Sequence, residues 1–176
     1  MNRIAQFEKI SFDEFKKSCI ELFKDLKGID DTQLKYIYDQ IELPTRSTKG
    51  SMGYDFKSVC FFQINPGQTV KIPTGIKVSI DEGWGLVIVP RSSYGFKYRA
   101  QLDNTIGIID SDYYNNKNNE GHIIVKMTND SNYKDNTLIC NPGDNFVQGI
   151  FLPYGITKDD NADGVRTGGF GSTDAK

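Results

Sequence analysis

Short segments rich in valine, isoleucine, phenylalanine and threonine follow one another from residue 53 to residue 152. Turn signals such as NPGQ, PTG, DEGWG and NPGD separate them, and no internal repeat is visible. Short β-prone segments at this spacing predict an all-β sandwich or barrel. The segments are GYDFKSVCFFQI, QTVKI, GIKVSI, GLVIV, HIIVKMT, TLIC and NFVQGIFL.

The first part of the chain has a different pattern. Residues 11–27, SFDEFKKSCIELFKDLK, carry apolar side chains at steps of three and four, which predicts an amphipathic helix. Ser11 and Glu14 form a capping-box pattern at its start. A second short helix is predicted in DDTQLKYIYDQI, and we therefore expect a helical extension over residues 1–42. The apolar residues on one face of the second helix are Leu34, Ile37 and Ile41.

Composition restricts the class of protein. Hydrophobic residues make up 38% of the chain, charged residues 25%, and the net charge is −2. This balance is typical of a globular protein in water and argues against a broad nucleic-acid surface, which needs clustered positive charge. No apolar run reaches the roughly 20 residues that span a bilayer, and the start of the chain lacks the apolar core of a signal peptide. Cys19, Cys60 and Cys140 lie far apart and fit no zinc spacing. Their odd number and the missing secretion signal predict buried thiols in a reducing cytoplasm. From charge and hydropathy, we expect neither a nucleic-acid nor a membrane partner.

The segment PRSSYGFKYRA follows the predicted strand GLVIV. Arg91 offers a planar fork of donors that suits a phosphate, and Ser92 and Ser93 add hydroxyls. A strand end of this kind also occurs as a plain turn. The fragment alone leaves both interpretations open.

The segment LDNTIGIIDSDYY places two carboxylates at the end of an apolar stretch. If that stretch is a strand, Asp110 and Asp112 share one face and Ser111 points to the other. One carboxylate could take a proton from a water molecule, whereas the simpler interpretation is a polar turn after a buried strand. Tyr113 and Tyr114 follow, and either could pack on a sugar or on the core.

Two later segments and one histidine complete the candidates. In NPGDNFVQGIFLPYG, Asp144 and Gln148 stand at the head of an apolar strand, where most such pairs only shape a turn. The tail VRTGGFGSTDAK carries Arg166 and Phe170 among glycines. It matches neither a dinucleotide-binding loop nor a Walker loop, because no lysine and no helix follow. His122, the single histidine, is predicted to be structural.

Five of these segments occur in a fixed order. GSMGYDF, PRSSYGF, LDNTIGIIDSDYY, GDNFVQGI and RTGGFGST span about residues 43–174 and resemble the five signatures of the trimeric dUTPases, the dUTP pyrophosphatases. The resemblance implies a jelly-roll subunit, a homotrimer with threefold symmetry, and active sites shared between subunits. It also implies hydrolysis of dUTP to dUMP and pyrophosphate, with Mg²⁺ as the cofactor.

The resemblance assigns roles to single residues. Asp110 is similar to the base that activates the attacking water, and Tyr113 to the residue that packs beneath deoxyribose and excludes a 2′-hydroxyl. Asp55 is similar to a supporting residue near the site. The implied metal is held mainly through substrate phosphates and water, as Mg²⁺ prefers. The other implied substrate-binding residues are Arg91, Ser92, Ser93 and Gln148 on the phosphate side, Asn104, Gly107 and Ile109 in the hairpin that reads uracil, Phe170 over uracil with Gly171 and Ser172 beside it in the tail, and Arg166 at the terminal phosphate.

We expect three parts in the chain: the helical extension over residues 1–42, a dUTPase-like β domain over residues 43–162, and a mobile glycine-rich tail over residues 163–176. Ordering such a tail costs about 1–2 kcal/mol per residue fixed. It should therefore close over the active site only where substrate contacts offset that cost. In a trimer, we expect the tail to close over a site whose Asp110 belongs to another subunit.

The sequence departs from the family pattern at a few positions. Met52 stands where alanine is usual, Ser93 where glycine is common, and the spacing between Arg166 and Gly168 is one residue short. Two alternatives are a dCTP deaminase or bifunctional dCTP deaminase and dUTPase of the same fold, and a non-catalytic jelly-roll module that binds a protein through its helices. The segment GIIDSDYY and the tail GGFGST favour dUTP hydrolysis.

Overall fold

The computed structural model describes residues 2–22, 28–164 and 166. The helix expected over residues 11–27 is present as α1, and its expected last part, residues 23–27, lies outside the described residues. The elements in chain order are β1 (Ala5–Lys9), α1 (Phe12–Leu22), α2 (Asp31–Asp39), β2 (Tyr54–Lys57), β3 (Phe62–Ile64), β4 (Thr69–Pro73), β5 (Ile76–Ile80), β6 (Trp84–Pro90), α3 (Ser92–Tyr98), β7 (Ala100–Leu102), β8 (Gly107–Ile109), the 3₁₀ helix η2 (Ser111–Tyr113), β9 (Ile124–Asn129), β10 (Leu138–Cys140) and β11 (Asn145–Pro153).

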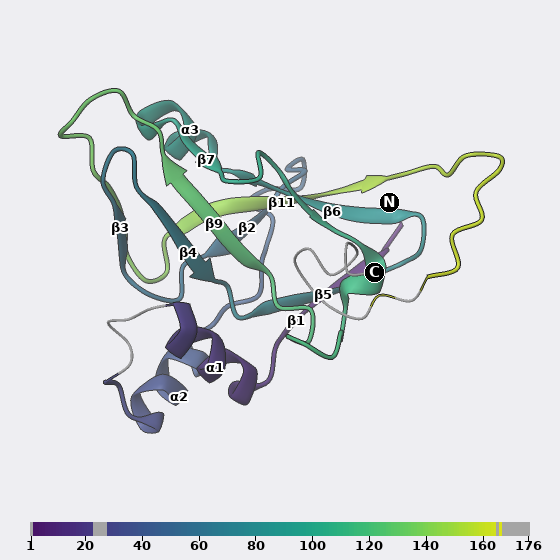
Figure 1. Cartoon of the computed structure of the whole chain (residues 1–176), viewed down its shortest axis with the longest axis horizontal. Coiled ribbons are helices and arrows are strands. Elements are labelled where there is room, and N and C mark those ends of the chain that lie inside the picture. Colours follow the sequence, from purple (N-terminus) through teal and green to yellow (C-terminus); the bar gives the residue numbers. More distant parts are fainter. Residues whose placement is uncertain (1, 23–27, 165, 167–176) are drawn as a thin grey trace.

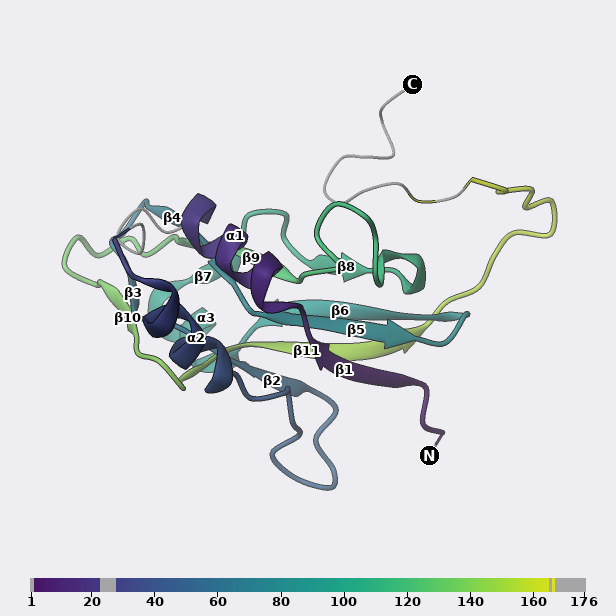
Figure 2. The same ribbon diagram turned by 90° about the horizontal axis from the view of Figure 1, so that it is seen from below.

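Antiparallel sheets form the body of the subunit (Figure 1). The largest has the strand order β2–β11–β6–β8, and a second has the order β4–β9–β7. Two further pairs, β1–β5 and β3–β10, complete the sheets of the described chain. Helices α1 and α2 lie together on one side of the strands, and the views in Figures 1 and 2 agree on this placement. The all-β, jelly-roll-like fold class expected from the sequence is confirmed.

Alternating burial explains why these segments pair as strands. In β5, Ile76, Val78 and Ile80 are buried, whereas Lys77 and Ser79 are partly exposed. Successive side chains of a strand point to opposite faces, so this pattern buries one face of the sheet. Each buried aliphatic side chain contributes about 1.5–3 kcal/mol. A register shifted by one residue would expose all three, and it is therefore strongly disfavoured.

The two N-terminal helices share the core of the strands. Phe15 and Cys19 of α1 are 0% and 1% exposed, and Leu34 of α2 is 2% exposed. All three belong to one cluster of buried side chains that also contains residues of β4, β5 and β9. The helices are therefore part of the subunit's own core. None of the described helices is long and apolar enough to cross a membrane.

Helix α1 begins with half of the expected capping box. The Ser11 hydroxyl accepts a hydrogen bond from the Glu14 backbone N–H at 3.2 Å, as expected. The Ser11 backbone N–H, which Glu14 would bind in a complete box, donates instead to Glu120 at 2.8 Å. A residue more than a hundred positions away in the sequence has thus replaced the local partner.

The strand β1 was not predicted from the sequence. It pairs with β5 from Ala5 opposite Ile80 to Lys9 opposite Ile76. None of its residues is fully buried, although Phe7 packs against the core. Its pairing is decided by the open edge of β5.

The three cysteines are buried, as expected. Burial raises the pKa of Cys19 and of Cys60 to about 12, and that of Cys140 to about 11. Since the thiolate is the reactive form, these thiols are inert at neutral pH and act as small apolar side chains.

His122 is fully buried and joins three segments. Its Nε2 accepts a hydrogen bond from the Gly75 backbone N–H at 2.9 Å, and its Nδ1 lies 3.0 Å from the Ser18 hydroxyl. Because Nε2 is an acceptor, Nδ1 carries the proton of the neutral ring. Burial lowers the pKa of His122 to about 3. The structural role expected for this histidine follows from these contacts.

Acid should destabilise the fold through His122. The unfolded histidine takes up a proton near pH 6.5, whereas the folded one stays neutral down to about pH 3. Its contribution is therefore complete above pH 6.5 and is lost as the pH falls toward 3. In His122→Gln, which keeps an acceptor for Gly75 but does not titrate, urea denaturation should show a weaker pH dependence. Between about pH 7 and 5, the wild-type unfolding free energy should drop by about 2 kcal/mol more than that of the variant. Parallel curves would contradict this account.

Candidate active site

A cleft of about 320 Å³ opens where β6 ends. Its lining includes Asp55 from β2, Arg91 and Ser92 at the junction of β6 and α3, and Gln148 from β11. Gln148 lies opposite Asp55 on one side and opposite Val89 of β6 on the other. The antiparallel pairing of β2, β11 and β6 therefore gathers residues that the sequence resemblance assigned to the phosphate side. Ser93, assigned to the same group, is exposed in α3 and does not line the cleft.

Arg91 is supported from one side by a carboxylate. Its Nε lies 3.6 Å from Asp55 Oδ1, and its backbone N–H donates to the Phe146 carbonyl at 3.3 Å. Asp55 also accepts a hydrogen bond from the Ser47 hydroxyl at 2.8 Å. The Asp55 side chain is 12% exposed and that of Arg91 34%. A guanidinium has five N–H donors, so one that is held in this way can still bind a phosphate.

The loop before β2 supplies lining residues that sequence reasoning missed. Ser47, Ser51 and Met52 border the cleft, and Met52 is 60% exposed. At Gly53, an added Cβ would lie 2.4 Å from Gln148 Oε1, so the glycine leaves space for that side chain. The run of small polar residues in TRSTKGSMG is the signal that could have indicated a binding loop.

A second group of site residues follows β8. Asp110 and Asp112 are more than half exposed, and Tyr113 is 6% exposed. The strand ends at Ile109, and η2 begins at Ser111 with Asp110 before it. The expected strand alternation therefore stops at this point. The 3₁₀ turn nevertheless lets both carboxylates reach one guanidinium, that of Arg166.

Arg166 lies against these carboxylates. Its Nη2 pairs with Asp110, its Nε lies 2.8 Å from Asp112 Oδ1, and its guanidinium carbon lies 5.8 Å from the centre of the Tyr113 ring. The Arg166 side chain is 17% exposed. The sequence resemblance assigned Arg166 to a terminal phosphate, and in this structure two carboxylates provide the negative charge opposite it. Phe170, Gly171 and Ser172, which were expected over the base, lie outside the described residues.

The hairpin between β7 and β8 carries the residues expected to read uracil. Thr105 adopts φ +67° and its N–H donates to Leu102 at 2.8 Å, and Ile106 donates to Asn104 at 2.7 Å. Gly107 pairs with Ile88 of β6, and a Cβ at Gly107 would lie 3.1 Å from the Ile88 Cβ. The hairpin therefore lies close to β6 and presents backbone donors and acceptors at an exposed tip.

The two groups lie toward opposite ends of β6. Ile109 pairs with Leu86 near the start of β6, whereas Arg91 directly follows the last residue, Pro90. At about 3.3 Å per residue, the backbones of Asp110 and Arg91 are roughly 20 Å apart. Side chains of their length do not bridge that distance. Within one chain, the cleft that contains Arg91 and the carboxylate pair of Asp110 and Asp112 are therefore separate.

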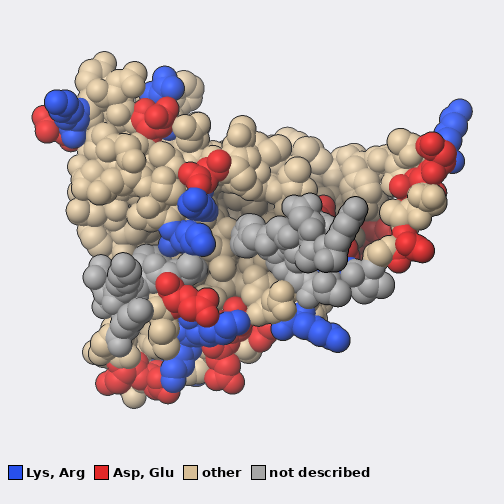
Figure 3. Space-filling view, in the orientation of Figure 1, with Lys and Arg blue, Asp and Glu red and all other residues tan. Residues whose placement is uncertain are grey.

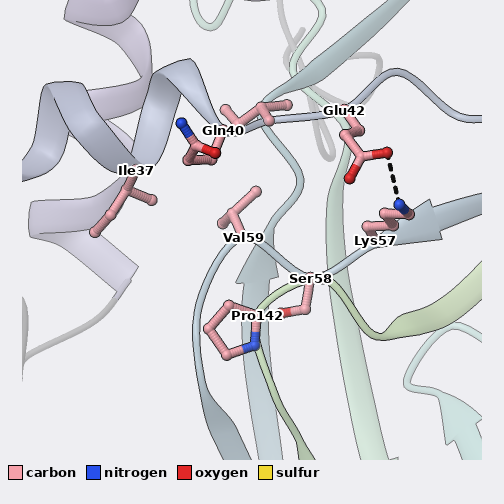
Figure 4. Close-up of a pocket in the computed structure, with 9 residues that line it drawn as sticks. Ile37, Gln40, Glu42, Lys57, Ser58, Val59 and Pro142 are labelled. Atoms are coloured by element: carbon pink, nitrogen blue, oxygen red, sulfur yellow. Dashed lines mark hydrogen bonds and ion pairs between the residues drawn. The ribbon is translucent and has the colours of Figure 1, made fainter.

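Another cavity, of about 230 Å³, lies between the end of α2 and the turn before β11 (Figure 4). Lys57 Nζ and Glu42 Oε2 form an ion pair of 2.6 Å at one side. No residue that was predicted for the site is among those that line it. Its apolar lining residues are Ile37, Ile41, Val59 and Pro142.

Acidic and basic side chains lie next to one another on the face shown in Figure 3. On the helices, Lys16 pairs with Asp31 at 2.6 Å, and Lys35 pairs with Asp39. Because the charges of opposite sign are mixed, this face of the described helices has neither a continuous positive patch nor a continuous negative one.

A mainly antiparallel β subunit with a guanidinium cleft and a separate carboxylate pair has the groups that an enzyme acting on phosphate compounds needs. A family model described as dUTPase matches residues 39–174. The deoxyuridine 5′-triphosphate nucleotidohydrolase of Lactococcus lactis subsp. lactis (strain IL1403) is 41% identical over 143 residues, covering 80% of this chain and 93% of that protein. The protein of the same name from Haemophilus influenzae (strain PittEE) is 36% identical over 143 residues, or 77% and 89% of the two chains. The chain belongs to the dUTPase family.

Solved structures agree with this assignment. The crystal structure of dUTPase from Streptococcus mutans matches with a TM-score of 0.59 and 40% identity, covering 66% of this chain and 88% of that one. The dUTPase from phage phi11 of S. aureus matches with a TM-score of 0.63 over 92% of this chain and 97% of that one. At 18% identity, this second match shows a shared fold.

Proposed function

We propose that this chain hydrolyses dUTP to dUMP and pyrophosphate in a homotrimer whose active sites are shared between subunits. The observation that carries the proposal is the separation of Arg91 and Asp110 along β6. Residues of one phosphate-binding site have to come within a few ångströms of one substrate. A neighbouring copy can bring its Arg91 cleft next to the Asp110 carboxylate of the first chain. Threefold symmetry then repeats this contact at every interface.

The outer face of the largest sheet supports such an assembly. Val87 of β6 lies between Ile108 of β8 and Ile150 of β11, and these side chains form an apolar row on one face. Ile108 is 62% exposed in the single chain, and Leu152 further along β11 is 41% exposed. Burying such a surface against other copies is favourable.

In the reaction, Asp110 takes a proton from a water molecule whose oxygen attacks the α-phosphorus. The bond from that phosphorus to the oxygen bridging to the β-phosphorus breaks, and pyrophosphate leaves. In the single chain the Arg166 guanidinium contacts the Asp110 carboxylate that has to face the water. The contact between Arg166 and Asp110 therefore has to open before proton transfer, which fits a guanidinium that moves to the phosphates.

Charge on the triphosphate is neutralised from the other side of the site by Arg91, with Ser92 and Gln148 as further donors. Phosphoryl transfer needs such positioning and charge more than covalent help. The carboxylates of Asp110 and Asp112 are more than half exposed, and their oxygens suit Mg²⁺ or its bound waters. When bound through the phosphates, the ion supplies further neutralisation of their charge.

Substrate choice is assigned to the hairpin and Tyr113. The backbone from Thr105 to Ile109 can match the alternating acceptors and donors of uracil, and Gly107 keeps the hairpin close to β6. Tyr113 occupies the space of a 2′-hydroxyl. Three unpaired buried thiols are compatible with a reducing cytoplasm, to which we assign the protein.

Pyrophosphate release across the deoxynucleoside triphosphates and UTP tests this function. We expect kcat/KM to be highest for dUTP, lower for dTTP because of its 5-methyl group, and at least about 100-fold lower for UTP. Ammonia release from dCTP would favour the deaminase alternative, and inactivity towards every nucleotide would favour a non-catalytic module. Equal values for UTP and dUTP would contradict the role of Tyr113.

A further inference from the structure

The loop that follows Tyr113, residues 114–122, fixes that side chain. The Tyr113 hydroxyl donates to the His122 carbonyl at 2.9 Å and accepts from Asn119 Nδ2 at 2.8 Å. Asn116 Nδ2 donates to the Tyr113 carbonyl at 2.9 Å and to Asn119 Oδ1 at 2.8 Å. The position of the Tyr113 ring therefore depends on the conformation of this loop.

The far end of the loop is conformationally strained. Glu120 adopts φ +57°, and Gly121 adopts φ +81°. A residue with a side chain pays about 1–2 kcal/mol in this left-handed region. At Gly121, a Cβ would lie 2.7 Å from the Tyr113 carbonyl oxygen, so the chain passes very close to the tyrosine backbone. Strain of this kind persists where surrounding contacts hold it.

The Glu120 backbone is bonded within the loop, whereas its carboxylate is held by the N-terminal segment and by β5. The Ser11 backbone N–H donates to Glu120 Oε2 at 2.8 Å, and the Ser11 hydroxyl donates to Oε1 of the same carboxylate at 2.5 Å. Lys77 Nζ lies 3.6 Å from the carboxylate. The left-handed residue is thus held by the residue before the first turn of α1.

Three more side chains of β1 and α1 contact the same loop. Their bonds lie along the length of the loop, so the N-terminal segment restrains it at both ends and in the middle. The contacts are Glu8 Oε2 with the Tyr114 hydroxyl at 2.8 Å, Lys17 Nζ with the Asn118 carbonyl at 3.1 Å, and Ser18 Oγ with His122 Nδ1 at 3.0 Å.

We propose that β1 and α1 position Tyr113 and thereby set how well the enzyme distinguishes dUTP from UTP. The inference rests on the proposed function, because it assigns the sugar contact to Tyr113. Ser11, Lys17 and Ser18 are positioning residues that act through the loop. When they release it, the ring moves away from deoxyribose and leaves room for a 2′-hydroxyl.

The double variant Glu120→Asn with Ser18→Ala tests the proposal. Asparagine tolerates the left-handed conformation but is too short to reach Ser11, so the restraint is lost without added strain. A displacement of about 1 Å can change a rate about 100-fold. We expect the ratio of kcat/KM for dUTP to that for UTP to fall at least about tenfold, through a higher KM for dUTP and a lower one for UTP.

Matched variants separate positioning from stability. Lys17→Met removes the bond to Asn118 together with an ion pair to Glu14, whereas Lys16→Met on the same helix removes only the ion pair with Asp31. We expect Lys17→Met to lower the ratio and Lys16→Met to leave it unchanged at a comparable Tm. Glu120→Gln, whose side chain still accepts a hydrogen bond from Ser11, should keep most of the wild-type ratio of kcat/KM for dUTP to that for UTP. If the double variant does not fold, the two lysine variants decide the question.

The outcomes also separate this inference from the proposed function. A wild-type protein that does not hydrolyse dUTP would contradict the function itself. A wild-type enzyme that prefers dUTP, with the same preference in the double variant and in Lys17→Met, would contradict the positioning role alone.

Discussion

Replacing Asp110 by asparagine is expected to lower kcat for dUTP by about 100-fold to 10,000-fold, the usual effect of removing a general base. The amide keeps the size of the side chain but does not accept the proton of the attacking water. Because the Asp110 side chain is 52% exposed, the fold should not depend on it. Steady-state kinetics with dUTP, together with the binding constant of a non-hydrolysable analogue, would measure the two effects separately.

Asp112→Asn is the matched control for this variant. Both carboxylates contact Arg166, and both are exposed to a similar extent, 52% and 56%. Each variant therefore removes one charge opposite the same guanidinium, but only Asp110→Asn removes the proposed base. Near-normal turnover of Asp110→Asn would show that Asp110 is not the general base. A larger loss of kcat in Asp112→Asn would assign the base to Asp112.

Two inactive variants should restore activity to each other when they are refolded together. Arg91→Ala loses the cleft and Asp110→Asn loses the base, and these residues lie toward opposite ends of β6 in one chain. In closed trimers assembled at random from equal amounts, roughly three quarters are mixed. Each mixed trimer contains one site with both an intact Arg91 and an intact Asp110, so activity should return to roughly one quarter of the wild-type value.

The control is each variant refolded by itself, which should remain nearly inactive. If one chain formed a whole site, no site in a mixed trimer would be complete, and activity would stay near zero. That result, with mixed trimers confirmed by mass, would overturn the shared-site proposal. The same experiment can use a chain truncated after Asp160 in place of the Arg91→Ala chain. It tests whether the tail serves the Asp110 of its own chain or that of a neighbour.

Local patterns in the sequence were sufficient for most of the fold. The β-prone residues of GIKVSI between turn signals predicted a strand, and apolar residues at steps of three and four, among them Phe15 and Cys19, predicted the first helix. Both signals depend only on neighbouring residues. The ordered signatures likewise indicated the candidate site residues, among them Arg91 and Asp110. The strand and helix predictions require only a short stretch of chain, whereas the signatures are recognised from their order over about residues 43–174.

Other features depend on residues that are far apart in the sequence. The segment AQFEK is short and has no fully buried residue, and its pairing with the edge of β5 makes it a strand. Ser11 had a local partner in Glu14, yet its backbone N–H is bound by Glu120. No local rule predicts which of two acceptors a donor will meet when one of them arrives from a distant loop.

The sequence by itself predicted most of the strands and the two N-terminal helices, because propensity and periodicity act over a few neighbouring positions. The candidate site residues came instead from the resemblance of the ordered signatures to a family. Only the tertiary structure decided how those residues are distributed in space. The pairing of β6 with β8 and β11 separates Arg91 from Asp110. The turn after β8 lets Asp110 and Asp112 meet Arg166. These placements follow from strand register and long-range packing, whose free energy comes from contacts that exist only once the whole chain has folded.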